Sequence, residues 1–121
     1  MGTQDGTGGG AGGRTVTLRE EREGEDTRFL CARLDAQGNL CIEGHDMGPT
    51  VVRILGGSEY EWAISLDAAA VPAYVRALGG AAGEDVLALL QAAVRDDPGC
   101  AGVSFLEQHG IPRSFWSRVG D

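Results

Sequence analysis

The sequence predicts a single α+β domain: a mainly antiparallel sheet of about four strands, with three to four helices packed on one face. Three observations lead to this prediction. The 121 residues are enough for one domain with a single core. Strand-like alternation of apolar and polar residues fills the first half of the chain, and helix-like apolar spacing follows it. Strands and helices grouped in separate parts of a chain are typical of α+β proteins.

The first 13 residues, MGTQDGTGGGAGG, are rich in glycine and hold no large apolar residue after Met1. Such a segment buries too little apolar surface to offset the entropy of ordering it. A glycine-rich loop that binds phosphate would be the functional alternative, but such a loop lies between a strand and a helix. No strand pattern precedes this segment. We therefore expect a flexible tail over residues 1–13 and one domain over residues 14–121.

Three strands are expected next. The stretch RTVTLREE, residues 14–21, places Val16 and Leu18 on one face, as a half-buried strand does. A charged turn, residues 21–26, separates it from a second strand over residues 27–34. A third strand, NLCIE, covers residues 39–43.

The loop DAQGN between the second and third strands predicts their register. A three-residue loop with Gly38 in the left-handed region is a common hairpin connection. It places Leu34 opposite Leu40 and Ala32 opposite Ile42. One face of the hairpin is then uniformly apolar and the other is mixed. The residues of the mixed face are Phe29, Cys31, Arg33, Cys41 and Glu43.

The middle of the chain predicts a strand end, a short helix and a further strand. We expect Gly44 to end the third strand and Pro49 to open a helix over PTVVRIL, because proline suits the first helical position. Gly56 and Gly57 stop this helix. SEYEWAISL, residues 58–66, alternates regularly and indicates a strand.

The rest of the chain is expected to be helical up to its last eleven residues. Asp67 is suited to capping a helix over residues 68–78, with an irregular start before Pro72. A second helix follows over GEDVLALLQAAVRDD, and a third lies around residues 100–109. The C-terminal IPRSFWSRVGD is expected to be extended or short-helical, with Phe115 and Trp116 docked on the core.

Charge excludes some classes of ligand. The net charge is −8, and all ten basic residues are arginines that are scattered along the chain. Without a basic patch, neither nucleic acid nor an anionic membrane surface is an expected ligand. An acidic protein instead suits a protein partner with a basic surface. The sequence shows no signal peptide and no apolar run of membrane length, and its three cysteines lack a CxxC spacing. We therefore expect a reduced, cytoplasmic protein.

The segment CIEGHDMGP contains the strongest candidate for a metal site. Within six positions it gathers Cys41, Glu43, His45 and Asp46, all of which are residue types that bind zinc. No pair of them has a diagnostic ligand spacing. The competing interpretation gives the neighbouring residues backbone roles at a strand end, with Asp46 in a cap or turn. Under that interpretation only His45 lacks a structural role.

Nothing in the sequence indicates catalysis. No serine, cysteine or histidine lies in a nucleophile motif such as GxSxG, so we expect neither an enzyme nor a cofactor. Glu59 and Glu61 point the same way from their strand and form an acidic stripe, with Tyr60 and Trp62 on the other side. Paired carboxylates of a glycosidase would need a cleft that a domain of this size hardly encloses.

Residues 34–116 resemble a family of small uncharacterised proteins from high-GC actinobacteria. The resemblance runs through LDAQGNLCIEGHDMGP, SEYEW, VPAYVRALGG, EDVLALL and FLEQHGIPRSFW. It implies a bacterial cytosolic protein and supports the fold, but it brings no known activity. In those proteins the position of His45 is commonly glutamine, and this would weaken the metal hypothesis because glutamine is a poor ligand.

The leading hypothesis is a non-catalytic protein-interaction domain, and its concrete form is a protein that masks a basic partner as an immunity protein or antitoxin does. Its interaction residues would be Glu59, Tyr60, Glu61 and Trp62. The alternative is a small metal- or ligand-binding domain that uses Cys41, Glu43, His45 and Asp46. The sequence does not indicate an oligomeric state.

Overall fold

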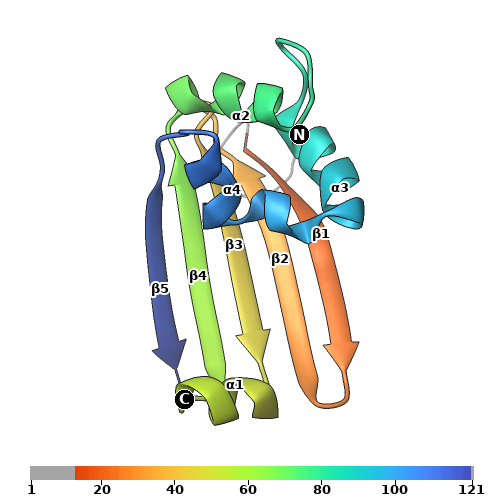
Figure 1. Cartoon of the computed structure of the whole chain (residues 1–121), viewed down its shortest axis with the longest axis vertical. Helices are drawn as coiled ribbons and strands as arrows, with labels where there is room; N and C mark the ends of the chain where they lie inside the picture. The colour runs from red at the N-terminus through yellow and green to blue at the C-terminus, as the bar shows by residue number, and fades with distance from the viewer. Residues whose placement is uncertain (1–12, 121) are drawn as a thin grey trace, which may run out of the picture.

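The computed structural model describes residues 13–120, and the tail predicted for residues 1–13 lies almost entirely outside this range. Within it, five antiparallel strands form one sheet in the order in which they occur along the chain (Figure 1). The strands are β1 (Arg14–Glu23), β2 (Asp26–Leu34), β3 (Leu40–Met47), β4 (Glu59–Leu66) and β5 (Ser114–Gly120). The α+β class and the antiparallel sheet are therefore confirmed.

The prediction of about four strands was one strand short. The fifth, β5, pairs with β4 along its whole length, from Ser65 opposite Ser114 to Glu59 opposite Gly120. Its sequence, SFWSRVG, has two adjacent aromatic residues in place of strict alternation, so periodicity alone gave only a weak strand signal. Phe115 and Trp116 do not dock on the core as expected: 50% of Phe115 and 53% of Trp116 is exposed to solvent.

In residues 13–120, four α-helices accompany the sheet. Three of them lie between β4 and β5 in the chain and cover one end of one sheet face (Figure 1). These are α2 (Val71–Ala77), α3 (Val86–Asp96) and α4 (Val103–Gln108), joined by the 3₁₀ segments η2 (Ala68–Ala70) and η3 (Pro98–Ala101). The fourth, α1 (Pro49–Leu55), connects β3 to β4 at the opposite end of the sheet. None of the described helices combines the length and the hydrophobicity of a membrane span.

The core lies between the sheet and helices α2 to α4. On the sheet side it contains Ile42 and Ile64, which are fully buried and lie opposite each other on β3 and β4. On the helix side, fully buried leucines and Tyr74 cover them. The Tyr74 hydroxyl donates a 2.7 Å hydrogen bond to the carbonyl of Cys100. This bond satisfies a buried polar group and joins α2 to η3.

The predicted β2–β3 register is confirmed, with Leu34 opposite Leu40 and Ala32 opposite Ile42. The Asp35 amide donates to the carbonyl of Asn39 at 3.0 Å, and Gly38 has a φ of +87°. The Asp35 carboxylate also accepts from the amides of Gln37 and Asn39, each at 2.9 Å. The loop is therefore held by side-chain as well as backbone hydrogen bonds.

Two local predictions were wrong. Gly44 does not end the third strand, because β3 continues to Met47 and pairs with β4 throughout. The Asp67 side chain does not cap the segment that follows it. The side-chain oxygen of Asn39 instead accepts from the amide of Ala68 at 2.8 Å, so the β2–β3 loop supplies this cap.

Candidate functional site

The sheet divides the predicted site residues between its two faces. Because side chains alternate along a strand, Glu59 and Glu61 point to one face of β4 while Tyr60 and Trp62 point to the other, as predicted. On β3, His45 lies opposite Glu61, and Asp46 lies opposite Tyr60. The four proposed metal ligands therefore do not converge, since Asp46 points away from the other three.

We call the face that carries Glu59 and Glu61 the open face, because in the described part of the chain no helix covers it. Its side chains form rows that run across the strands. One row contains Phe29, His45, Glu61 and Arg118, which are successive cross-strand partners on β2 to β5. The neighbouring row contains Cys31, Glu43, Ala63 and Trp116. Side chains in such rows lie close enough to interact.

A polar cluster lies along the first of these rows and extends to Glu59, which points to the same face two residues before Glu61. The Nε2 atom of His45 lies 3.2 Å from Oε1 of Glu59. Glu61 accepts hydrogen bonds from both Nε (3.1 Å) and an Nη atom of Arg118, and this contact lowers the pKa of the Glu61 carboxyl. One nitrogen of His45 and one oxygen from each of Glu59 and Glu61 lie within 4.8 Å of one another. This is the group of predicted residues that the structure does bring together.

The remaining predicted ligands on the open face have other partners. Glu43 accepts from both terminal nitrogens of Arg33, at 3.1 and 3.3 Å, and from the thiol of Cys31 at 3.6 Å. Burial and this carboxylate raise the pKa of Cys31 to about 11, and burial raises that of Cys41. Both shifts favour the protonated thiol, which is a poor nucleophile.

A shallow hollow of about 240 Å³ lies beside the polar cluster. Phe29 and Trp116 line it, together with His45, Glu61 and Ala63. Ala63 is small and stands between Glu43 and Trp116 in its row, so the face is recessed there. The hollow thus combines aromatic and carboxylate groups in one place.

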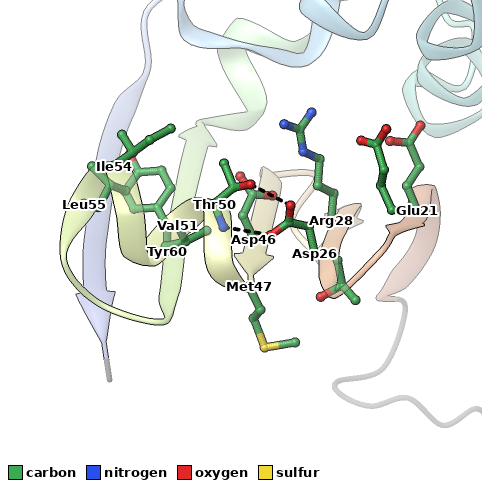
Figure 2. Close-up of a pocket in the computed structure, with 12 residues that line it drawn as sticks. Glu21, Asp26, Arg28, Asp46, Met47, Thr50, Val51, Ile54, Leu55 and Tyr60 are labelled. Atoms are coloured by element: carbon green, nitrogen blue, oxygen red, sulfur yellow. Dashed lines mark hydrogen bonds between the residues drawn. The ribbon is translucent and has the colours of Figure 1, made fainter.

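The opposite face has a cleft where α2 to α4 leave the sheet uncovered. Figure 2 shows this cleft, of about 230 Å³, with Ile54, Leu55 and Tyr60 along one side and Arg28 and Glu21 along the other. A second hollow of about 170 Å³ continues from it towards the core helices. The two share Arg28 and Asp46, and the second one reaches Trp62 and Ala101.

Two carboxylates in this cleft differ in their surroundings. Asp26 accepts from the amide of Thr50 at 3.0 Å and from its hydroxyl at 2.6 Å (Figure 2), and these bonds lower the pKa of Asp26. Asp46 is half-buried, and its burial raises its pKa in spite of the nearby charge of Arg28. Asp26 thus anchors α1. Asp46, in contrast, is a partly buried carboxylate whose charged form is destabilised by the loss of contact with water.

The second histidine has a structural place. The ring of His109 lies against that of Phe105, with the centroids 4.4 Å apart, at the C-terminal end of α4. A histidine at this end of a helix is favourable for the helix dipole. His45 is therefore the histidine that belongs to a polar cluster.

Sequence reasoning missed Phe29, Trp116 and Arg118 as site residues. The sequence did place Phe29 on the mixed face of the hairpin together with Glu43, and this was the one indication that it lies near the site. Trp116 and Arg118 could not be placed beside Glu61 because β5 had not been recognised as a strand.

Comparison of the chain with protein-family models, with curated proteins and with solved structures gave no match. The resemblance to small actinobacterial proteins stays a prediction, and the proposals below depend on geometry and chemistry alone.

Proposed function

We propose that this chain is a small, non-catalytic protein-interaction domain that binds a partner with a basic surface through the open face of its sheet. The observation that carries this proposal is the pair Phe29 and Trp116, which are 39% and 53% exposed and line the same hollow as His45 and Glu61. Large exposed aromatic residues next to charged groups are typical anchors of protein interfaces.

The chemistry of the hollow favours an arginine or lysine side chain of the partner. A cation there can contact the aromatic faces of Phe29 and Trp116 and the carboxylate of Glu61, and the carboxylate of Glu59 lies beside that of Glu61. The net charge of −8 speeds the approach of a basic protein. The side chains of Tyr60 and Trp62, which were predicted to share this role, point to the other face of the sheet. Trp62 also borders the hollow, but the proposed contact does not use it.

An immunity- or antitoxin-like role follows naturally from such a surface, because masking a basic partner requires shape and charge but no catalysis. Three free cysteines, two of them buried, fit a reducing compartment, so we place the protein in the cytoplasm.

Affinity capture from the source organism tests this function. The wild-type chain should retain a basic partner in stoichiometric amount, and Trp116→Ser or the double variant Glu59→Lys/Glu61→Lys should lose it. Asp96→Lys/Glu107→Lys is the matched control, because it makes the same change of charge on α3 and α4. If no partner is retained, or if both double variants lose it equally, the proposed surface is wrong.

A second candidate function is binding of a divalent metal ion, and one observation favours it. His45, Glu59 and Glu61 present an imidazole nitrogen and two carboxylate oxygens within 4.8 Å of one another. This donor set suits Zn²⁺, with an open position for water or a ligand. The ion pair with Arg118 argues against metal binding, because the Glu61 carboxylate would have to give up its hydrogen bonds to the guanidinium in order to bind the ion.

Titration of the untagged protein with Zn²⁺ separates the two candidates. Binding of one ion should raise the melting temperature and should be lost in His45→Ala but kept in His109→Ala, which removes the other histidine. No heat of binding and no thermal shift would reject the metal site and leave the interaction proposal unchanged.

A further inference from the structure

The two edges of the sheet differ in how they are protected from other strands. The β1 edge, RTVTLREERE, has six charged residues among ten, and its register shifts between Thr17 and Arg19. Charges and bulges of this kind prevent an edge strand from pairing with another chain. The β5 edge, SFWSRVG, has the single charge of Arg118, and its register with β4 is continuous. The β5 edge therefore lacks the protection that β1 has.

Strand β5 also exposes apolar side chains on both faces. Phe115, Trp116 and Val119 are 50%, 53% and 45% exposed. Phe115 and Val119 lie on the helix side of the sheet, in line with Ile64 and Tyr60, and Trp116 lies on the open face. An edge with unpaired backbone groups and exposed apolar side chains is a template for another strand.

The end of β5 is held firmly in place. Gly57, in the turn after α1, packs so closely on it that an added Cβ would lie 2.5 Å from the carbonyl oxygen of Gly120 and 2.7 Å from a methyl carbon of Val119. The edge is thus already in strand geometry before anything pairs with it, which reduces the entropy lost on pairing.

We propose that β5 pairs antiparallel with β5 of a second copy of this chain, around a two-fold axis at Ser117. In this register Phe115 lies opposite Val119 of the second copy, and Trp116 lies opposite Arg118 of the second copy. The first is an apolar pair and the second a cation–aromatic pair, and both stabilise neighbouring strands. The strand is therefore complementary to itself.

Neighbouring registers are less favourable. An axis at Arg118 places the two guanidinium groups directly opposite each other, and like charges in that position are destabilising. An axis at Trp116 brings Pro112 opposite Gly120, and proline has no N–H to donate to the ladder. The axis at Ser117 pairs all seven residues of β5 and avoids both problems.

This pairing joins the two sheets into one and places both open faces on the same side, because the two-fold axis is perpendicular to the sheet. The dimer would then present the proposed partner-binding surface twice. The two proposals share Trp116 and Arg118, but they remain separable, because the residues changed to test the pairing, Phe115 and Val119, lie on the helix side of the sheet and Glu59 and Glu61 take no part in the pairing.

The mass of the full-length protein, measured by analytical ultracentrifugation from micromolar to near-millimolar concentration, tests the pairing. The wild type should approach twice the monomer mass, while Phe115→Lys and Val119→Glu should each be monomeric. The double variant Phe115→Lys/Val119→Glu should dimerise again at low salt, because each lysine then faces a glutamate. Val52→Lys, a similarly exposed position on α1, should leave the dimer intact.

Cross-linking provides a second measurement, and it needs only a single conservative substitution on β5. Opposed residues of antiparallel strands have Cα atoms about 4.5–5.5 Å apart, which suits a disulfide. Ser117→Cys should form a covalent dimer on mild oxidation, and Ser104→Cys, on the exposed surface of α4, should not. A monomeric wild type at every concentration, or equal cross-linking of both variants, would overturn the proposal. A double variant that stays monomeric would overturn the register.

Discussion

At the scale of single residues, Gly44 on β3 and Trp62 on β4 form a close contact. A Cβ built on Gly44 would lie 2.2 Å from Cε2 of the Trp62 indole, so the ring occupies the space where any other residue would have a side chain. Glycine inside a strand often marks such a close approach. That signal was present in the sequence, but the indole that needs the space lies on the next strand.

We expect Gly44→Ala to destabilise the protein by about 1–3 kcal/mol, because the added methyl group overpacks the site and forces the Trp62 ring to move. Chemical denaturation followed by circular dichroism measures this change. In a Trp62→Leu background Gly44→Ala should cost less stability. The double variant should therefore lose less free energy of unfolding than the two single variants lose when their losses are added. Strictly additive effects would show that Gly44 is needed for another reason.

At the scale of elements, the hairpin of β2 and β3 was the part most completely predicted. A short loop with its glycine at one position fixes the register of both strands, so Ala32 and Ile42 could be paired from sequence. The β3–β4 pairing depends on how α1 turns the chain between them, and no local pattern encodes that. For this reason the contact of His45 with Glu59 could not be predicted, although both residues had been singled out.

Helix α1 depends on a cap supplied from a distant part of the chain. It has seven residues and no side-chain cap of its own, and Asp26 in the β1–β2 hairpin binds both the amide and the hydroxyl of Thr50. Asp26→Ala should therefore loosen α1. Faster amide hydrogen exchange over residues 50–56, with little change in α3, is the expected result.

The effect of Asp26 should depend on pH. Because the pKa of Asp26 is lowered in the folded state, its carboxylate contributes stability above the pKa of the unfolded chain, and that contribution disappears as the pH falls through the folded pKa.

Thr50→Val, which keeps the amide and removes the hydroxyl, should have a smaller effect on hydrogen exchange in α1 than Asp26→Ala. Exchange that is unchanged in both variants would mean that α1 is held by packing alone.

At the scale of the whole molecule, alternation along the strands was enough to separate the polar and apolar site residues. Glu59 and Glu61 were correctly separated from Tyr60 and Trp62, because parity along one strand is a local property. The partners of these side chains come from other strands: His45 from β3 and Arg118 from β5. A site assembled across strands can be predicted only as far as the strand order and register are known.

The acidic balance of the molecule predicts how its stability responds to pH. Among the residues that the structure describes, five carboxyl groups have a lowered pKa, and in each case a hydrogen bond to the charged form is the main cause. These groups are Glu21, Asp26, Asp35, Glu61 and Asp85. Their contributions are complete above the unfolded pKa values of about 4 and are lost as the pH falls through the lower, folded values. The melting temperature should therefore fall in acid.

The pKa of Asp46 is shifted in the opposite direction from those of the five other carboxyl groups, and this gives the most specific prediction. Burial raises its pKa, so the folded state binds the proton more readily than the unfolded state, and the charged form destabilises the fold near neutral pH. Asp46→Asn should raise the melting temperature at pH 7, and this advantage should shrink as acid protonates the wild-type carboxyl. Asp96→Asn, at the exposed end of α3, should show no such trend in melting curves taken across the same pH range. If Asp46→Asn instead lowers stability at neutral pH, the carboxylate makes a favourable contact in the cleft that outweighs its burial, and Arg28 is then the residue to test next.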